Sequence, residues 1–104
     1  MKIDFSAKLV GFDGEPIKDA EGNTITLGGA AVIALTTPRA DDSRLSGDEK
    51  FKRGEIARIA WESDKNAQLA QLTVEDVAIV KSAIGQGWST LVVWSAFRLI
   101  EGTP

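Results

Sequence analysis

The sequence predicts an α+β fold in which a small N-terminal β-hairpin or meander packs on a three- to four-helix bundle. Two patterns support this prediction. Turn signals separate short strand-like segments over residues 5–26, and four later segments combine helical apolar spacing with N-terminal capping residues. The 104 residues suffice for one core and leave no room for a second, so we expect a single domain over residues 1–104.

The β prediction rests on turn chemistry. Asp13-Gly14 is a strong turn dipeptide, because glycine accepts the positive φ that a tight turn requires. Residues 16–18 and 23–26 flank a four-residue loop, so they can pair with Ile17 and Ile25 on one face. Pro16 cannot donate a ladder hydrogen bond, which places it at a strand start or an edge. An isolated hairpin is marginal in water, so this region must lie on an apolar surface.

The first helix is predicted over residues 27–36. Thr26 is a suitable N-cap, and the apolar residues that follow it have helical spacing. Gly28 and Gly29 oppose the helix by about 1 kcal/mol each relative to alanine. We expect the helix to end before Thr37-Pro38, because the residue that precedes a proline is pushed away from helical geometry.

The second helix is predicted over residues 46–63, after a polar connection at residues 37–45 for which the sequence offers no ordering contact. Ser46 and Glu49 match a capping box, in which each side chain bonds the backbone amide of the other. Gly54 lies inside this helix. We attribute it to the close approach of a neighbouring helix, because a mid-helix glycine costs stability and usually has a packing reason.

The last two helices are predicted over residues 73–85 and 89–101, after a loop or frayed turn at residues 64–71. A very short glycine-rich link joins them, so they must lie antiparallel or sharply crossed. The final helix is apolar around nearly its whole circumference. Its narrow polar edge consists of Ser95, Arg98 and Glu101. Such a helix is either buried all round or faces another chain, and a domain of this size encloses it with difficulty.

Composition excludes much catalytic chemistry. The chain has no cysteine, histidine or tyrosine, which removes disulfides, thiolate and histidine metal sites, and Ser-His or Cys-His nucleophile pairs. We therefore expect no cofactor, no metal ion and no enzymatic activity. An enzyme that uses only Asp, Glu, Ser, Thr or Lys is the weakest hypothesis, because no nucleophile has an evident activating base. The carboxylates and amide between Asp13 and Asn23 lack calcium-loop spacing and are explained by turns.

Charge and hydropathy limit the partners. The net charge is −3, and the basic cluster at residues 50–53 is flanked by acidic residues, so we expect no nucleic-acid binding. The most apolar run, residues 91–100, is about half the ~20 residues that a membrane span requires, and we expect no membrane association. The N-terminus has no apolar core of signal-peptide length, so we expect a cytoplasmic protein.

The candidate interaction residues lie in and before the final helix. Core packing is the expected role of at least two of the three tryptophans, Trp61, Trp88 and Trp94. Trp88 differs from the others because it lies in a glycine-flanked turn, where an exposed ring would anchor a partner. The Gly85–Thr90 segment lacks the lysine and preceding strand of a phosphate loop, so we interpret it as a turn between helices. The predicted interaction residues are Trp88, Val92, Trp94, Phe97 and Ile100.

Three stretches together resemble a known group of proteins. They are Asp13–Asp19 through Thr24–Leu27, Leu45–Arg53, and Leu72–Asp76 through Leu91–Val93. In this order and spacing they resemble small, mostly uncharacterised proteins of tailed bacteriophages and prophages. The resemblance implies a non-catalytic role in particle assembly or on host proteins, and it carries over no functional residues.

Two functional hypotheses follow from the resemblance and from the apolar final helix. The first is a self-associating protein–protein interaction module that acts in virion or tail assembly. Its partners are other copies of itself, phage structural proteins or both, in the host bacterial cytoplasm or on the virion. The alternative is a phage-encoded inhibitor that binds a host defence or regulatory protein.

Overall fold

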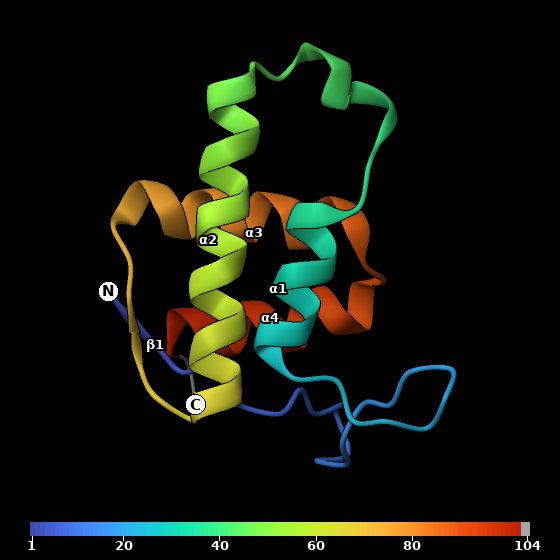
Figure 1. The fold of residues 1–104 in the computed structure, drawn as a ribbon. Coiled ribbons are helices and arrows are strands. Elements are labelled where there is room, and N and C mark those ends of the chain that lie inside the picture. The colour runs from blue at the N-terminus through green and yellow to red at the C-terminus, as the bar shows by residue number, and fades with distance from the viewer. Residues whose placement is uncertain (103–104) are drawn as a thin grey trace.

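The computed structural model describes residues 1–102, and the backbone alone of residues 40 and 41. The fold is α+β, as predicted, with helices packed together and a small β region at the N-terminus (Figure 1). In chain order the elements are β1 (Lys2–Ile3), α1 (Leu27–Thr36), the 3₁₀ helix η1 (Ala40–Arg44), α2 (Gly47–Asn66), β2 (Ala70–Gln71), α3 (Val74–Gly87) and α4 (Thr90–Glu101).

The core lies where α1 meets α2 and α3. Figure 1 shows the long helix α2 in front, beside α1, with α3 and α4 behind them. The largest side chains that are almost fully removed from solvent come from the N-terminal segment and from α1, α2 and α3. They are Phe5, Leu9, Leu27, Ile56, Val80 and Ile84. The N-terminal β region therefore lies on an apolar surface, as a short β structure must.

The N-terminal β region is a three-segment meander whose first and last segments also pair. The Leu9 amide donates to the Ile25 carbonyl, the Ile17 amide to the Leu9 carbonyl, and the Ile25 amide to the Ile17 carbonyl, each at 2.9 Å. The antiparallel bridges are Lys8–Thr26, Val10–Pro16 and Lys18–Thr24. The predicted pairing across residues 19–22 is thus confirmed. The three segments together form a closed ring.

The acidic residues of the ring hold its turns. Asp13 Oδ1 accepts from the Glu15 amide at 3.0 Å, and Asp19 Oδ1 accepts from the Glu21 and Asn23 amides at 2.9 and 3.0 Å. The turns contain Gly14 and Gly22, both with positive φ near +80°, a conformation that glycine adopts without steric cost. Turn chemistry explains both aspartates, as expected.

The predicted caps of the first two long helices are present. Thr26 Oγ1 accepts from the Gly29 amide at 3.0 Å and donates to Asp64 Oδ2 at 2.8 Å, so one hydroxyl caps α1 and ties it to α2. Ser46 and Glu49 form the predicted capping box at the start of α2. α1 spans the predicted residues, and α2 runs about one turn beyond its predicted end.

Two segments predicted as loops contain regular structure. The segment at residues 64–71 contains the last turn of α2 and then β2, which pairs antiparallel with β1 through Ile3 and Ala70. The connection at residues 37–45 contains η1. The Arg39 guanidinium orders this connection, because it donates to the Ala34 carbonyl at 2.6 Å and the Ala83 carbonyl at 3.2 Å.

Helix α4 is buried on one side only, so of the two alternatives stated for this helix, burial all round is wrong. Leu91 and Leu99 are exposed, whereas Ser95, which was assigned to a polar edge, is buried. The N-terminal ring explains the difference. Ser95 Oγ accepts from the Val10 amide at 3.0 Å, so the ring covers the side of α4 that carries Ser95.

Candidate interaction surface

The five predicted interaction residues divide into two groups. Val92 and Ile100 are each 4 % exposed and belong to the core, so their assignment to an interaction surface was wrong. They lie on the inner side of α4, where they are removed from solvent by the chain itself. Trp88, Trp94 and Phe97 are half-buried and remain candidates.

Trp94 is covered in part by Phe12, a residue outside the predicted set. The two ring centroids are 4.6 Å apart with an interplanar angle of 63°, an edge-to-face geometry that aromatic pairs favour. Phe12 is 79 % exposed, so most of its ring faces solvent. The Arg98 guanidinium lies 4.9 Å from the centroid of the Trp94 ring and makes a cation–π contact.

Trp94 and Trp88 line one shallow hollow. Its volume is about 300 Å³, and its lining residues are Gly85, Trp88, Thr90, Val93 and Trp94. Trp88 is oriented there by a hydrogen bond from its Nε1–H to the Ala30 carbonyl at 3.0 Å. The ring is therefore held by α1, and its half-buried state differs from the free anchor that the turn position suggested.

Charged side chains lie beside the Phe97 ring. Lys81 Nζ lies 4.8 Å from the Phe97 ring centroid and also pairs with Glu101 at 2.6 Å. We name the group made by Phe12, Trp88, Trp94 and Phe97 the aromatic surface. Charged groups of both signs border it, a pattern typical of protein interfaces.

The expectation that at least two tryptophans fill the core is wrong. Trp61 on α2 is 53 % exposed, and Trp88 and Trp94 are half-buried. Phe12 was missed because its only sequence signal is its place beside the Asp13-Gly14 turn. An aromatic ring at a turn has no periodic pattern that assigns it to a face.

The described part of the chain has neither a metal-binding cluster nor a membrane-spanning helix. Among the side chains that the structure describes, no three acidic groups come together in an arrangement that could hold a metal ion. No helix among the described residues is long and apolar enough to cross a membrane.

Comparison with known proteins assigns no relatives. No family model, no curated protein and no solved structure matches this chain. The exposed residues of the aromatic surface are therefore the main structural indication of function.

Proposed function

We propose that this protein is a non-enzymatic protein–protein interaction module of phage or prophage origin. It associates with itself through the aromatic surface and acts in virion or tail assembly, in the host bacterial cytoplasm or on the virion. The observation that carries the proposal is the exposed Phe12 ring against the edge of Trp94. The phage origin rests on the resemblance of the capping and turn segments.

The aromatic surface has the composition that binding hot spots favour. Tryptophan and arginine are enriched at hot spots, and Trp94 with Arg98 supplies both in direct contact. Aromatic rings contribute a large contact area and lose few rotamers on binding. A second copy offers the same surface, and two identical patches related by a twofold axis form the commonest kind of homo-oligomer.

The proposal is tested by light scattering with the wild type and two variants. At high micromolar concentration the wild type should have an average mass above that of one chain, and Phe12→Ser should lower it. Val74→Ser is the matched control, because Val74 is 70 % exposed on α3 and lies outside the aromatic surface. A wild type that stays monomeric would contradict the proposal. So would a Phe12→Ser variant that associates as the wild type does.

The competing proposal is a phage-encoded inhibitor that binds a host defence or regulatory protein through the same surface. The exposed acidic residues Asp13 and Glu15 lie within three residues of Phe12 and would suit a basic partner. Capture from host lysate separates the two proposals. An assembly module should retain phage proteins or itself, whereas an inhibitor should retain one host protein, and Phe12→Ser should release it.

A further inference from the structure

A hollow of about 400 Å³ lies between the end of α1, the start of α2 and the connection that contains η1. Figure 1 shows this connection arching from one helix to the other. The volume is within the range of small-molecule sites in proteins, about 300–1,000 Å³. We name it the η1 hollow. Its lining is mostly apolar with two cations, and includes Leu35, Pro38, Leu45, Lys50, Arg53 and Gly54.

Hydrogen bonds within the chain hold the wall of the η1 hollow that η1 supplies. The Arg39 amide donates to Asp42 Oδ2 at 2.8 Å, and the Leu45 amide donates to the Asp42 carbonyl at 3.0 Å. The Arg39 guanidinium ties the same segment to α1 and α3 through the Ala34 and Ala83 carbonyls. The hollow is therefore formed before any ligand binds, as most small-molecule sites are.

Gly54 lies on the α2 side of this hollow. The sequence predicted a close neighbouring helix at Gly54, and that prediction is wrong, because a Cβ built there meets no heavy atom of the described residues within 4 Å. A glycine inside a helix lowers helix stability, since it adds backbone entropy to the unfolded state. The missing side chain widens the η1 hollow. A molecule bound in the hollow would explain this glycine, whereas packing within the chain does not.

The cations of α2 differ in whether the chain supplies them with partners. Of the five, Lys52 pairs with Asp76 of α3 at 3.1 Å. Lys65 Nζ lies 5.8 Å from the centroid of the Trp61 ring, within the range of a cation–π contact. These two lysines lie outside the lining of the η1 hollow.

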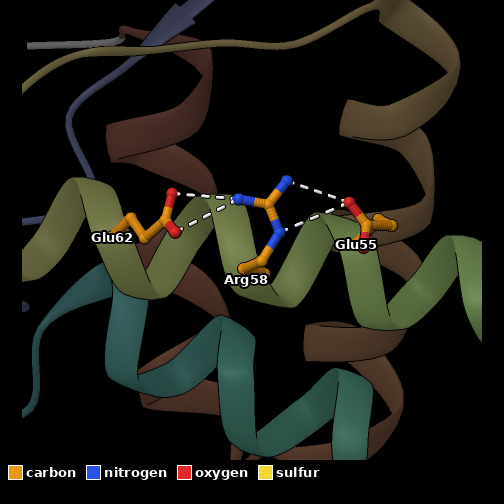
Figure 2. A network of polar contacts seen from close by, with 3 residues as sticks. All are labelled: Glu55, Arg58 and Glu62. Atoms are coloured by element: carbon orange, nitrogen blue, oxygen red, sulfur yellow. Dashed lines mark hydrogen bonds and ion pairs between the residues drawn. The ribbon is translucent and has the colours of Figure 1, made fainter.

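Arg58 is also held within the chain. Its guanidinium binds Glu55 Oε2 at 2.9 Å on one side and both carboxylate oxygens of Glu62 at 3.0 and 3.1 Å on the other (Figure 2). Its hydrogen bonds to these two glutamates, together with their charge, raise the pKa of Arg58. This guanidinium is therefore engaged without a ligand.

Lys50 and Arg53, the two cations that line the η1 hollow, differ from the other three. Neither has a hydrogen bond, an ion pair or an aromatic contact with another residue in the described part of the chain. Arg53 is half-buried, so its guanidinium has lost part of its water without gaining a partner in exchange. An anion in the hollow would supply that partner.

We propose that the η1 hollow binds a small organic molecule that has an apolar body and one carboxylate. The apolar body lies against Leu35, Pro38 and Leu45, and the carboxylate lies beside Lys50 and Arg53. A guanidinium binds a carboxylate through two parallel hydrogen bonds, and a lysine adds a compact positive charge. Apolar walls with a few polar groups that orient the ligand are typical of small-molecule sites.

The surrounding charges favour a ligand with a single negative charge. Asp42 also lines the η1 hollow, so its carboxylate offsets one of the two cations. Asp48 and Glu49 line the next hollow together with Arg53. A phosphate monoester carries about −1.5 to −2 at pH 7 and would be repelled more strongly by these carboxylates than a monoanion.

This site is separate from the aromatic surface, because the two share no lining residue. The inference therefore goes beyond the proposed function. Self-association without ligand binding, or ligand binding without self-association, would separate the two proposals.

The proposal is tested by two-dimensional NMR titration of the full chain with octanoate, and with 1-octanol as a neutral probe of the same length. We expect saturable shifts at the Leu35, Leu45 and Gly54 amides. Octanoate should bind about tenfold or more tightly than 1-octanol, because hydrogen bonds to charged groups are the stronger ones. Equal affinities would overturn the proposal. So would shifts confined to the aromatic surface, or a titration with no saturable binding.

A double variant tests the two cations. Lys50→Gln with Arg53→Gln should remove the preference for octanoate and leave the affinity for 1-octanol unchanged. Arg58→Gln with Lys65→Gln is the matched control, because it removes the same charge from the same helix outside the hollow. A preference for octanoate that survives in the first variant, or disappears equally in both, would contradict the proposal.

A third variant fills the hollow. Gly54→Leu should fold, because no heavy atom of the described residues lies within 4 Å of the new Cβ, and it should weaken octanoate binding by about tenfold or more. Gly47→Leu is the control on the same helix, since a Cβ there also meets no described heavy atom within 4 Å and Gly47 does not line the hollow. Circular dichroism checks that both variants are folded. Octanoate binding by folded Gly54→Leu at the wild-type affinity would place the ligand elsewhere and overturn the proposal.

Discussion

Gly28 of α1 lies so close to Asp64 of α2 that a Cβ on the glycine would be 2.7 Å from the aspartate Cβ. The same Cβ would lie 3.0 Å from the Phe5 carbonyl oxygen and 3.1 Å from that of Ala60. Two of the three neighbours are backbone atoms, which cannot turn aside. The glycine that opposed the first helix in the sequence therefore allows the two helices to pack closely.

We predict that Gly28→Ala destabilises the protein by about 1–3 kcal/mol, because overpacking forces neighbouring backbone apart. Gly54→Ala is the matched control, since a Cβ there meets no heavy atom of the described residues within 4 Å. There the same change should stabilise the fold by up to about 1 kcal/mol through helix propensity. Urea unfolding of dilute protein measures both. Equal effects of the two substitutions would contradict the close contact.

The Thr26 hydroxyl should contribute stability through both of its bonds. Thr26→Val keeps the side-chain shape and removes the bonds to the Gly29 amide and Asp64. We expect a loss of about 1–2 kcal/mol in the free energy of unfolding, the typical cost of losing a helix cap. Thr26→Ser keeps the hydroxyl and should retain most of the stability. If the serine variant loses as much as the valine variant, the bonds are not the cause.

Ser95 should hold the N-terminal ring on α4. Ser95→Ala leaves the part-buried Val10 amide without its acceptor, at a cost of about 1–3 kcal/mol. Faster hydrogen exchange at the Val10 amide would locate the effect. Ser82→Ala, a change at an exposed serine, should alter neither the free energy of unfolding nor this exchange rate. Unchanged protection of the Val10 amide would mean that this hydrogen bond does not fasten the ring.

The Arg58 network should stabilise α2 in a salt-dependent way. Arg58→Gln removes the ion pairs to Glu55 and Glu62, so the thermal midpoint should fall at low salt and match the wild type in concentrated salt, which screens exposed charges. Because the pKa of Arg58 is raised, its contribution persists below the ordinary arginine pKa and is lost only as pH rises through the folded value. A difference that survives high salt would argue for packing instead.

The helix starts could be predicted because capping is local chemistry. Thr26, Ser46 and Thr73 each accept from the amide three residues later, and this relation is visible in the sequence. The pairing of β1 with β2 could not be predicted. Each strand has two residues, too few for a period, and their partners are separated by most of the chain.

The interaction surface was only partly predictable for a related reason. Apolar side chains occupy nearly the whole circumference of α4, so no broad polar face indicates which side is buried. The sequence therefore could not distinguish Val92, a core residue, from Trp94, a surface residue. The position of the ring decides this, because the ring covers Ser95 and brings Phe12 to Trp94. That placement depends on tertiary contacts that no local pattern encodes.

The closed ring of the N-terminal β region also limits how other chains can bind this protein. At Leu9, Ile17 and Ile25 both the amide and the carbonyl are already bonded within the ring. These residues offer no main-chain groups for strand addition, the route by which exposed β edges recruit extended peptides or seed amyloid. At these three positions, recognition by another chain must therefore use side chains, which a partner reads by shape and charge.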